Sequence, residues 1–310
     1  MEQSVWVAIF AAGIIAGTPI LLAALGEILA ELAGVINLGV EGMMLVGAVT
    51  GFMVALHTTE PWLGLLAAVA AGGLMALIHA FLTITLRANQ VVSGLALTIF
   101  GTGLSGYIGK SLIGLPLTNT FKPFALPGLS ELPAVGIILF RHDALVYLSY
   151  GLVALLWFFL FRTRKGLAMR AVGENPGAAD TAGIPVFRVR YLFVIIGGML
   201  AGMAGAYLSL AYAPSWLENM TAGRGWIAVA LVIFATWHPG KAFLGSFLFG
   251  TIDVLGFHMQ NFGIAVPSFF LKMLPYVITI AVLIVVTRET RKRRVATPAA
   301  LGIPYNREER

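Results

Sequence analysis

Apolar segments of about 17–25 residues recur along almost the whole chain and leave few folds open to it. A helix of about 20 apolar residues spans the hydrocarbon core of a bilayer. The segments are continuous rather than alternating, which argues against the strands of a transmembrane barrel. We therefore predict an all-α fold, a polytopic transmembrane helical bundle of about nine spans with interrupted helices. The expected spans cover residues 6–30, 36–56, 61–86, 91–112, 143–161, 189–212, 224–238, 241–257 and 268–287.

The composition supports this fold class and excludes most catalytic chemistry. Of the 310 residues, 59% are hydrophobic and 11% are charged, and the mean hydropathy is +0.90, whereas soluble domains carry about 25% charged residues. The absence of cysteine excludes disulfides, thiolate catalysis and cysteine metal sites. The sequence has no HExxH, GxSxG or GxxxxGKS/T motif, and its five histidines lack metal-ligand spacing. We therefore expect no catalytic centre, no metal site and no ATP hydrolysis in this chain.

Lys and Arg residues are distributed unevenly between the two predicted faces of the bundle. Most of the 20 lie on the side that carries residues 162–190 and the segment after Arg288. Positive residues mark the cytoplasmic side, so we predict a multi-pass protein of the cytoplasmic (inner) membrane with a cytoplasmic C-terminus and an external N-terminus. The net charge of +6 is then a topology signal rather than a nucleic-acid-binding surface.

This orientation divides the chain into one large domain and a tail. We expect a single transmembrane domain over residues 1–290, with an external loop at 114–142 and a cytoplasmic loop at 162–190. Four prolines make a regular helix through the external loop unfavourable. Residues 291–310 are expected to form a solvated basic cytoplasmic tail.

Two of the apolar segments are interrupted by glycines and polar residues. Asn37 and Glu41 lie among the glycines of GVINLGVEG at 34–42, and Arg224 lies between two glycines in MTAGRGW at 220–226. Irregular backbone at membrane depth is stable only where protein or water covers it, and broken helices in transporters often line the substrate path. Close helix packing through small residues is the alternative explanation. The pattern alone does not separate the two.

Few ionisable or polar residues lie within the predicted spans, and five are candidates for a translocation pathway. Glu41 and Asp253 are the strongest, because a charge within the bilayer usually faces a cavity or a partner. Asn37 adds a polar group at the first interruption. At the start of the fourth span, Asn89 and Ser93 either contact a polar neutral solute or cap the helix.

The polar segment 162–190 is longer than a simple connection between two spans requires. Residues 166–174 predict a short helix. Asn175 and Pro176 are the residue types of an N-cap and a first helical position, which predicts that a second helix starts there. Gly183 is a C-cap signal for this second helix. Helices this short are unstable alone, so the segment indicates a docking surface for a cytoplasmic partner.

At these residues the chain resembles a known family. GLAMRAVGENPGAADTAGI at 166–184 is similar to the coupling-helix segment of ABC importer permeases of the branched-chain amino acid/simple sugar/nucleoside superfamily. INLGVEGMMLVGA at 36–48 resembles the second-span motif of the nucleoside-type branch, and the likeness runs from Asn37 to Arg288. Sugar-type relatives often have an acidic-Leu-Ser motif where this chain has Asn37-Leu38-Gly39, which favours the nucleoside branch. The resemblance implies that the segment contacting an ATPase includes Arg170, Gly173, Glu174, Asn175, Pro176, Asp180 and Gly183.

The resemblance also implies a function and a set of partners. The chain would be the transmembrane permease subunit of an ATP-driven importer, moving nucleosides or, alternatively, simple sugars. The expected partners are two cytoplasmic ATPase subunits that bind ATP and Mg, a second related permease subunit and an external solute-binding lipoprotein, with no cofactor in this chain. A self-sufficient secondary transporter is a hypothesis of a different class. It needs coupling-ion groups, for which only Glu41 and Asp253 qualify.

Overall fold

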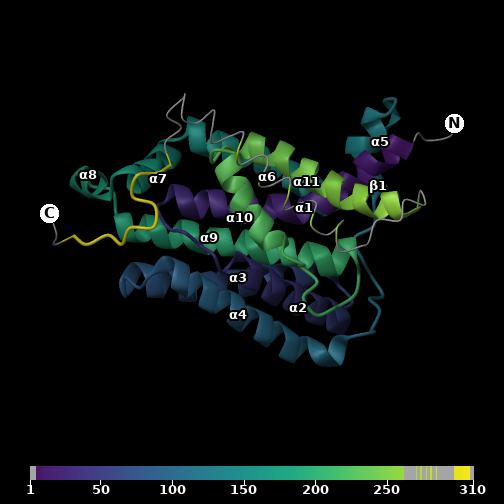
Figure 1. The fold of residues 1–310 in the computed structure, drawn as a ribbon, viewed down its shortest axis with the longest axis horizontal. Coiled ribbons are helices and arrows are strands. Elements are labelled where there is room, and N and C mark those ends of the chain that lie inside the picture. The colour runs from purple at the N-terminus through teal and green to yellow at the C-terminus, as the bar shows by residue number, and fades with distance from the viewer. Residues whose placement is uncertain are drawn as a thin grey trace.

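The protein is a bundle of long apolar helices. The computed structural model describes residues 5–261 and 297–307, together with positions 270, 273, 277, 280 and 284. Within these residues, six helices are long and apolar enough to cross a membrane, and Figure 1 shows them side by side. They are α1 (Val5–Leu32), α2 (Val40–Thr58), α3 (Pro61–Ala80) continued by η1 (Phe81–Thr85), α4 (Gln90–Gly109) continued by η2 (Lys110–Leu112), α6 (Ala144–Arg162) and α9 (Val186–Tyr207) continued by η4 (Leu208–Tyr212).

Four further helices lie beyond α6 in the described chain. α7 (Arg164–Glu174) and α8 (Pro176–Thr181) lie between α6 and α9, and α10 (Arg224–Phe234) is followed by α11 (Pro239–Asn261). α10 has 11 residues, so at 1.5 Å per residue it is about 16 Å long, roughly half the hydrocarbon thickness. Figure 1 shows it lying obliquely in the middle of the bundle. α10 therefore begins and ends among other helices.

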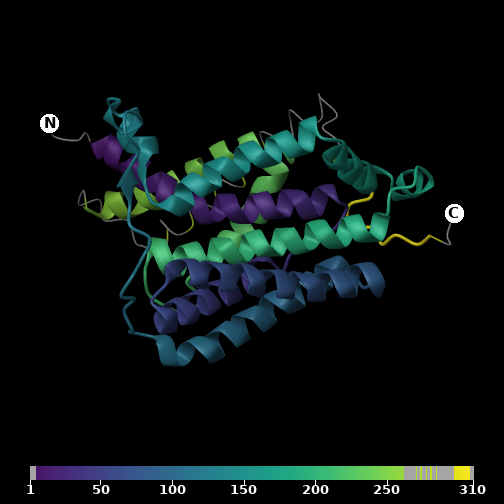
Figure 2. The same cartoon turned by 180° about the vertical axis from the view of Figure 1, so that it is seen from behind.

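α1 is the central helix of the bundle. Nearly all its residues from Gly13 onward are buried, and Figure 2 shows it between α6 and α9. Small residues allow the backbones to approach closely: a Cβ added to Gly26 would lie 2.5 Å from the carbonyl oxygen of Gly197 on α9. Such contacts between small residues are typical of helix packing in membranes.

The segment between α4 and α6 is structured and lies at the same end of the bundle as the N-terminus (Figure 1). It contains β1 (Phe124–Ala125), η3 (Leu129–Glu131), α5 (Val135–Phe140) and β2 (Arg141–His142). The two strands pair antiparallel with Phe124 opposite His142. Burial lowers the pKa of the His142 imidazole, which keeps the ring neutral where its Nε2 meets the Ile138 carbonyl oxygen at 2.6 Å.

The structure confirms the all-α fold class. A long apolar helix covers each of the first six predicted spans, with shifts of a few residues at the ends. The predicted span 224–238 contains only the short helix α10. The predicted span 268–287 lies largely outside the described residues, so the total of nine spans stays a prediction. The expectation of a solvated tail over residues 291–310 stays a prediction. In its described part, residues 297–307, Ala300 is buried and the segment hydrogen-bonds to α7 and α9.

The close contact between α1 and α9 leads to a stability prediction. Gly26→Val would place methyl groups against the Gly197 carbonyl, where no space exists, so we expect a destabilisation of about 1–3 kcal/mol. A fall of several degrees in the melting temperature of the purified protein in detergent would show this. Gly103→Val is the matched control, because a Cβ at Gly103 on α4 meets nothing within 4 Å. Equal melting temperatures for the two variants would contradict the packing account.

Candidate functional site

The chain between α1 and α2, residues 33–39, is not helical, and side chains from neighbouring helices bind its backbone. The Asn37 N–H donates to Oε1 of Glu27 on α1 at 2.9 Å. The Ile36 N–H donates to Oε1 of Gln90 at 2.7 Å, and the Leu38 carbonyl accepts from Oγ1 of Thr98 at 2.8 Å. Unpaired backbone groups cost several kcal/mol in lipid, so these side chains make the break between α1 and α2 tolerable.

A histidine completes the support of this break. Nε2 of His79 lies 2.9 Å from the Ile36 carbonyl oxygen, and Nδ1 lies 3.0 Å from Oγ of Ser93. Because a carbonyl only accepts, Nε2 of the neutral ring is the donor to the Ile36 carbonyl. Nδ1 then accepts a hydrogen bond from the Ser93 hydroxyl. The resulting chain of hydrogen bonds joins α4, α3 and the break.

A second irregular segment, residues 213–223, leads into α10, and Glu41 binds the start of that helix. The Glu41 carboxylate accepts three hydrogen bonds: from Oγ1 of Thr221 at 2.6 Å, from the Gly223 N–H at 2.8 Å and from the Gly225 N–H at 2.6 Å. The N-terminus of a helix carries unpaired N–H groups and a partial positive charge, which a carboxylate stabilises. Glu41 therefore caps α10 from the first turn of α2 and fastens the two broken helices together.

The two glycines beside Arg224 are required by this contact. Gly223 has φ +82°, in the left-handed region that side chains disfavour. A Cβ on Gly225 would lie 2.5 Å from Oε2 of Glu41. The glycines of this interruption therefore allow the close approach of Glu41, as the packing alternative requires, and the place of this segment on a substrate path stays a prediction.

Arg224 is held by two neighbours at the same helix start. Its Nη2 forms an ion pair with Oδ2 of Asp253 on α11 at 3.0 Å, and its guanidinium lies 5.5 Å from the ring centre of Tyr212. Glu41 and Asp253 were both predicted from the sequence as pathway residues. Each contacts a residue in the first turn of α10. In this structure each carboxylate has a partner within the protein.

The other three predicted pathway residues lie near the first break. Asn37 is buried, and its Oδ1 accepts from the Gly39 N–H at 3.1 Å. Asn89 is exposed and caps α4, accepting from the Val91 and Val92 N–H groups at 3.0 and 3.1 Å. Its capping role is therefore observed. Ser93 is buried and engaged with the imidazole described above.

Sequence reasoning missed the residues that support the breaks from elsewhere in the chain. These are Glu27, His79, Gln90, Thr98 and Thr221. Their signal was the rarity of polar groups within apolar spans, but a single sequence does not show which backbone group each one reaches.

The segment between α6 and α9 has the two helices expected of it. Oδ1 of Asn175 accepts from the Ala178 N–H at 2.9 Å, so Asn175 is the N-cap of α8 as predicted, and Pro176 occupies its first position. Gly183 has φ +81° and follows the helix end, as a C-cap glycine does. Oγ1 of Thr163 caps α7 in the same way, accepting from the Gly166 N–H.

Three of the remaining predicted coupling residues lie on α7 and contact other parts of the protein. The Arg170 guanidinium lies 5.3 Å from the ring centre of Phe161. Gly173 packs on the end of α1, where an added Cβ would lie 2.2 Å from the Leu32 carbonyl oxygen. Oε2 of Glu174 accepts from the Ala299 N–H at 3.4 Å. α7 is therefore in direct contact with the end of α1 that precedes the first break.

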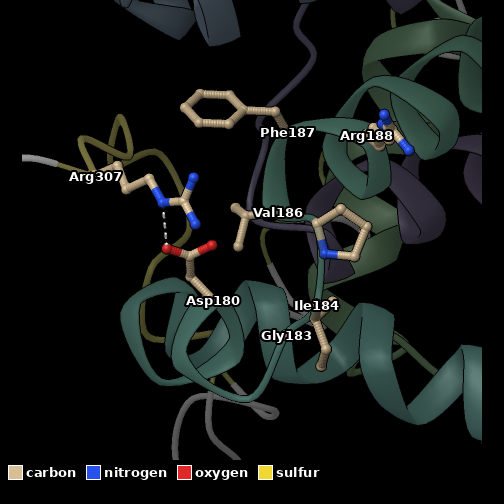
Figure 3. A pocket seen from close by; sticks show the side chains of 8 residues that line it. Asp180, Gly183, Ile184, Val186, Phe187, Arg188 and Arg307 are labelled. Atoms are coloured by element: carbon tan, nitrogen blue, oxygen red, sulfur yellow. Dashed lines mark hydrogen bonds and ion pairs between the residues drawn. The ribbon is translucent and has the colours of Figure 1, made fainter.

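Asp180 on α8 is bound by the C-terminal residues. Its Oδ2 accepts from the Tyr305 hydroxyl at 3.0 Å and from Nε of Arg307 at 2.9 Å. Figure 3 shows Arg307 reaching Asp180 across a pocket that Phe187 and Arg188 also line. The pocket has a volume of about 300 Å³. The predicted coupling residues are therefore brought together at one end of the bundle, with the C-terminal segment beside them.

Comparison with known proteins identifies the family. A family model described as the permease component of branched-chain amino acid transport systems matches residues 9–287. The chain belongs to this family. A putative glucose ABC transporter permease protein of Haloferax volcanii is 47% identical over 96% of this chain and 99% of its own length.

Two further relatives carry nucleoside names. A guanosine ABC transporter permease protein of Bacillus subtilis is 36% identical over 96% of each chain. A nucleoside ABC transporter permease protein of Lactococcus lactis is 35% identical over 87% of this chain and 89% of its own. Permease components of this kind are transport subunits, so the chain is a permease subunit of an ABC transporter and not an enzyme.

The Glu41 contact leads to a prediction about the variants Glu41→Ala and Glu41→Gln. Alanine leaves the buried N–H groups of Gly223 and Gly225 without their acceptor, at a cost of about 1–3 kcal/mol for each group. We expect Glu41→Ala to lower the melting temperature and to abolish uptake of the transported solute. Glu41→Gln keeps one acceptor oxygen, so its melting temperature and uptake should lie between those of Glu41→Ala and the wild type. Exposed Glu60, whose side chain makes no capping hydrogen bond, is the control. A Glu41→Ala protein as stable as Glu60→Ala would contradict the capping role.

Proposed function

We propose that the chain is the permease subunit of an ATP-driven importer that moves nucleosides across the cytoplasmic membrane. The observation that carries this proposal is the pair of broken helices that meet at Glu41, because both acidic groups at this point have partners within the protein. Glu41 caps the start of α10, and Asp253 on α11 is paired with Arg224. A path beside these pairs suits a neutral polar solute rather than an ion.

The relatives and the sequence at the first break support a nucleoside within this class. Two relatives are named for guanosine or nucleoside transport. The Asn37-Leu38-Gly39 sequence replaces the acidic-Leu-Ser motif that is frequent in sugar-type permeases. Asn37 lies at the first break, where its side chain engages Gly39 and Met43.

Simple sugars are the second candidate, and a specific observation favours them. The Haloferax volcanii relative, named as a putative glucose permease, is 47% identical along almost its entire length. Glucose is also neutral and polar, so the paired charges at α10 suit it equally. Substrate uptake separates the two candidates.

The test compares the uptake of labelled guanosine and labelled glucose by cells that lack this chain. Expression of the wild-type chain should restore guanosine uptake and leave glucose uptake unchanged. Gly225→Val is the matched inactive control, because its side chain would collide with the Glu41 carboxylate. Restoration of glucose uptake alone would establish the sugar candidate. Restoration of neither solute would reject both.

We assign the coupling of transport to ATP hydrolysis to the segment formed by α7 and α8. We infer that two ATPase subunits, which carry ATP and Mg, bind this end of the bundle, and that a second related permease and an external solute-binding lipoprotein complete the transporter. The packing of Gly173 on Leu32 supports a transfer of movement from α7 to α1. A displacement of α7 by the ATPase would reach the end of α1, and through it the first break, as a rigid-body movement.

Arg170→Ala tests the coupling segment. Arg170 lies outside the six long apolar helices and is half-buried against Phe161, a contact worth about 0.5–1 kcal/mol. We therefore expect normal membrane insertion and a several-fold loss of uptake, with weaker co-purification of the ATPase subunits. Lys110→Ala, at an exposed position at the other end of the bundle, is the control. Equal uptake by both variants would remove Arg170 from the coupling surface.

A further inference from the structure

Residues 297–307 form an irregular segment with a turn at 299–302. The segment crosses the cytoplasmic end of the proposed permease and touches four separate parts of it. The Ala300 N–H donates to the Gly173 carbonyl at the end of α7 at 3.0 Å. Two residues later, the Gly302 N–H donates to the Gly34 carbonyl in the first break at 3.3 Å. Ala300 itself is 7% exposed. The segment therefore bridges the end of α7 and the break directly.

Side chains fasten the same segment to α9. Arg190 is 2% exposed, and its Nη1 donates to the Ile303 carbonyl at 3.1 Å. The ring of Tyr305 lies 5.7 Å from the ring of Phe187. A buried guanidinium needs acceptors. The hydrogen bond from Arg190 to the Ile303 carbonyl therefore stabilises the start of α9 and also holds Ile303 in place.

α8 is attached through Asp180. The Asp180 side chain is only 10% exposed, because the Tyr305 hydroxyl and the Arg307 guanidinium both bind it, while the Arg307 side chain is 67% exposed. Beneath them, Val172, Ala179 and Val186 form a small apolar cluster. Tyr305 packs against this cluster, which α7, α8 and α9 share.

We propose that residues 297–307 are a strap that holds α7 and α8 to the break between α1 and α2, so that the coupling helices and the break move together. The proposal rests on the function proposed above, in which an ATPase displaces α7 and α8. α8 has six residues, too few for a stable isolated helix. Apart from the strap, the chain connections on either side of α8 and its apolar cluster join α8 to the bundle.

The strap also changes the surface that an ATPase meets at α8. Asp180 is covered, and the exposed group above it is Arg307. Tyr305 and Arg307 are then positioning residues that act through α8. An exposed ion pair contributes little by itself, so the strap depends on the sum of its backbone, ring and side-chain contacts.

The first experiment measures hydrogen exchange in the purified chain and needs no ATPase. A chain that ends at residue 296 is compared with one that ends at residue 307, which keeps every described contact. We expect exchange in peptides covering 175–184 and 33–37 to be about tenfold faster in the shorter chain, because several hydrogen bonds are lost. Unchanged exchange in these peptides would overturn the strap, whatever the ATPase does.

Point variants keep the test valid if the shortened chain fails to fold. Arg307→Ala and Tyr305→Phe should each accelerate exchange in 175–184, and Arg307→Lys should restore part of the protection. Arg188→Ala is the matched control, because Arg188 lines the same pocket without an ion pair in the described part of the chain. If Arg188→Ala had the same effect as Arg307→Ala, the specific contact with Asp180 would be excluded.

The second experiment measures solute transported per ATP hydrolysed in the reconstituted complex. The chain ending at residue 296 should still co-purify with the ATPase subunits and support ATP hydrolysis, with transport per ATP reduced about fivefold or more because the movement of α8 is no longer passed to the break. Full transport per ATP would overturn the strap. Loss of co-purification in the shorter chain alone would make the segment a docking element instead. Failure of the wild-type chain to bind an ATPase would reject the proposed function. In that case the hydrogen-exchange experiment would still show whether residues 297–307 act as a strap.

Discussion

The contact between the Glu41 carboxylate and the start of α10 is the interaction on which the centre of this bundle depends. A helix that begins within a membrane exposes N–H groups that lipid cannot satisfy. Glu41 supplies the acceptor from another broken helix, and Thr221 completes its coordination. The carboxylate beside one interruption and the N–H groups of the other therefore satisfy each other. This reciprocity explains why a carboxylate and glycines occur together in otherwise apolar sequence.

The first break follows the same rule with different chemistry. Its backbone is satisfied by a carboxylate from α1, an imidazole from α3 and an amide and a hydroxyl from α4. The preceding helix α1 and the more distant α3 and α4 therefore together fix the position of Asn37. Asn37 is buried in this arrangement, so a solute would reach it only after the helices around it had moved.

Much of the fold was predictable from the sequence because its signals are local. Long apolar runs marked the six long helices, and the chemistry of Asn175, Pro176 and Gly183 marked the ends of α8. The rarity of charge within apolar sequence was sufficient to select Glu41 and Asp253, although it did not reveal that both act at α10.

The course of residues 297–307 was not predictable. Their contacts span more than 100 positions, as between Asp180 and Tyr305, and a basic, polar sequence has the composition of a solvated end.

α1 carries two carboxylates one turn apart near its end, and each holds a different broken region. Glu27 accepts from the Asn37 N–H in the first break, and Glu31 accepts from the indole N–H of Trp237 just after α10 at 2.6 Å. Since both carboxylates belong to one rigid helix, a rotation or axial shift of α1 would strain both attachments at once. The two regions are therefore attached to the same helix, and a movement of α1 changes its position relative to both of them.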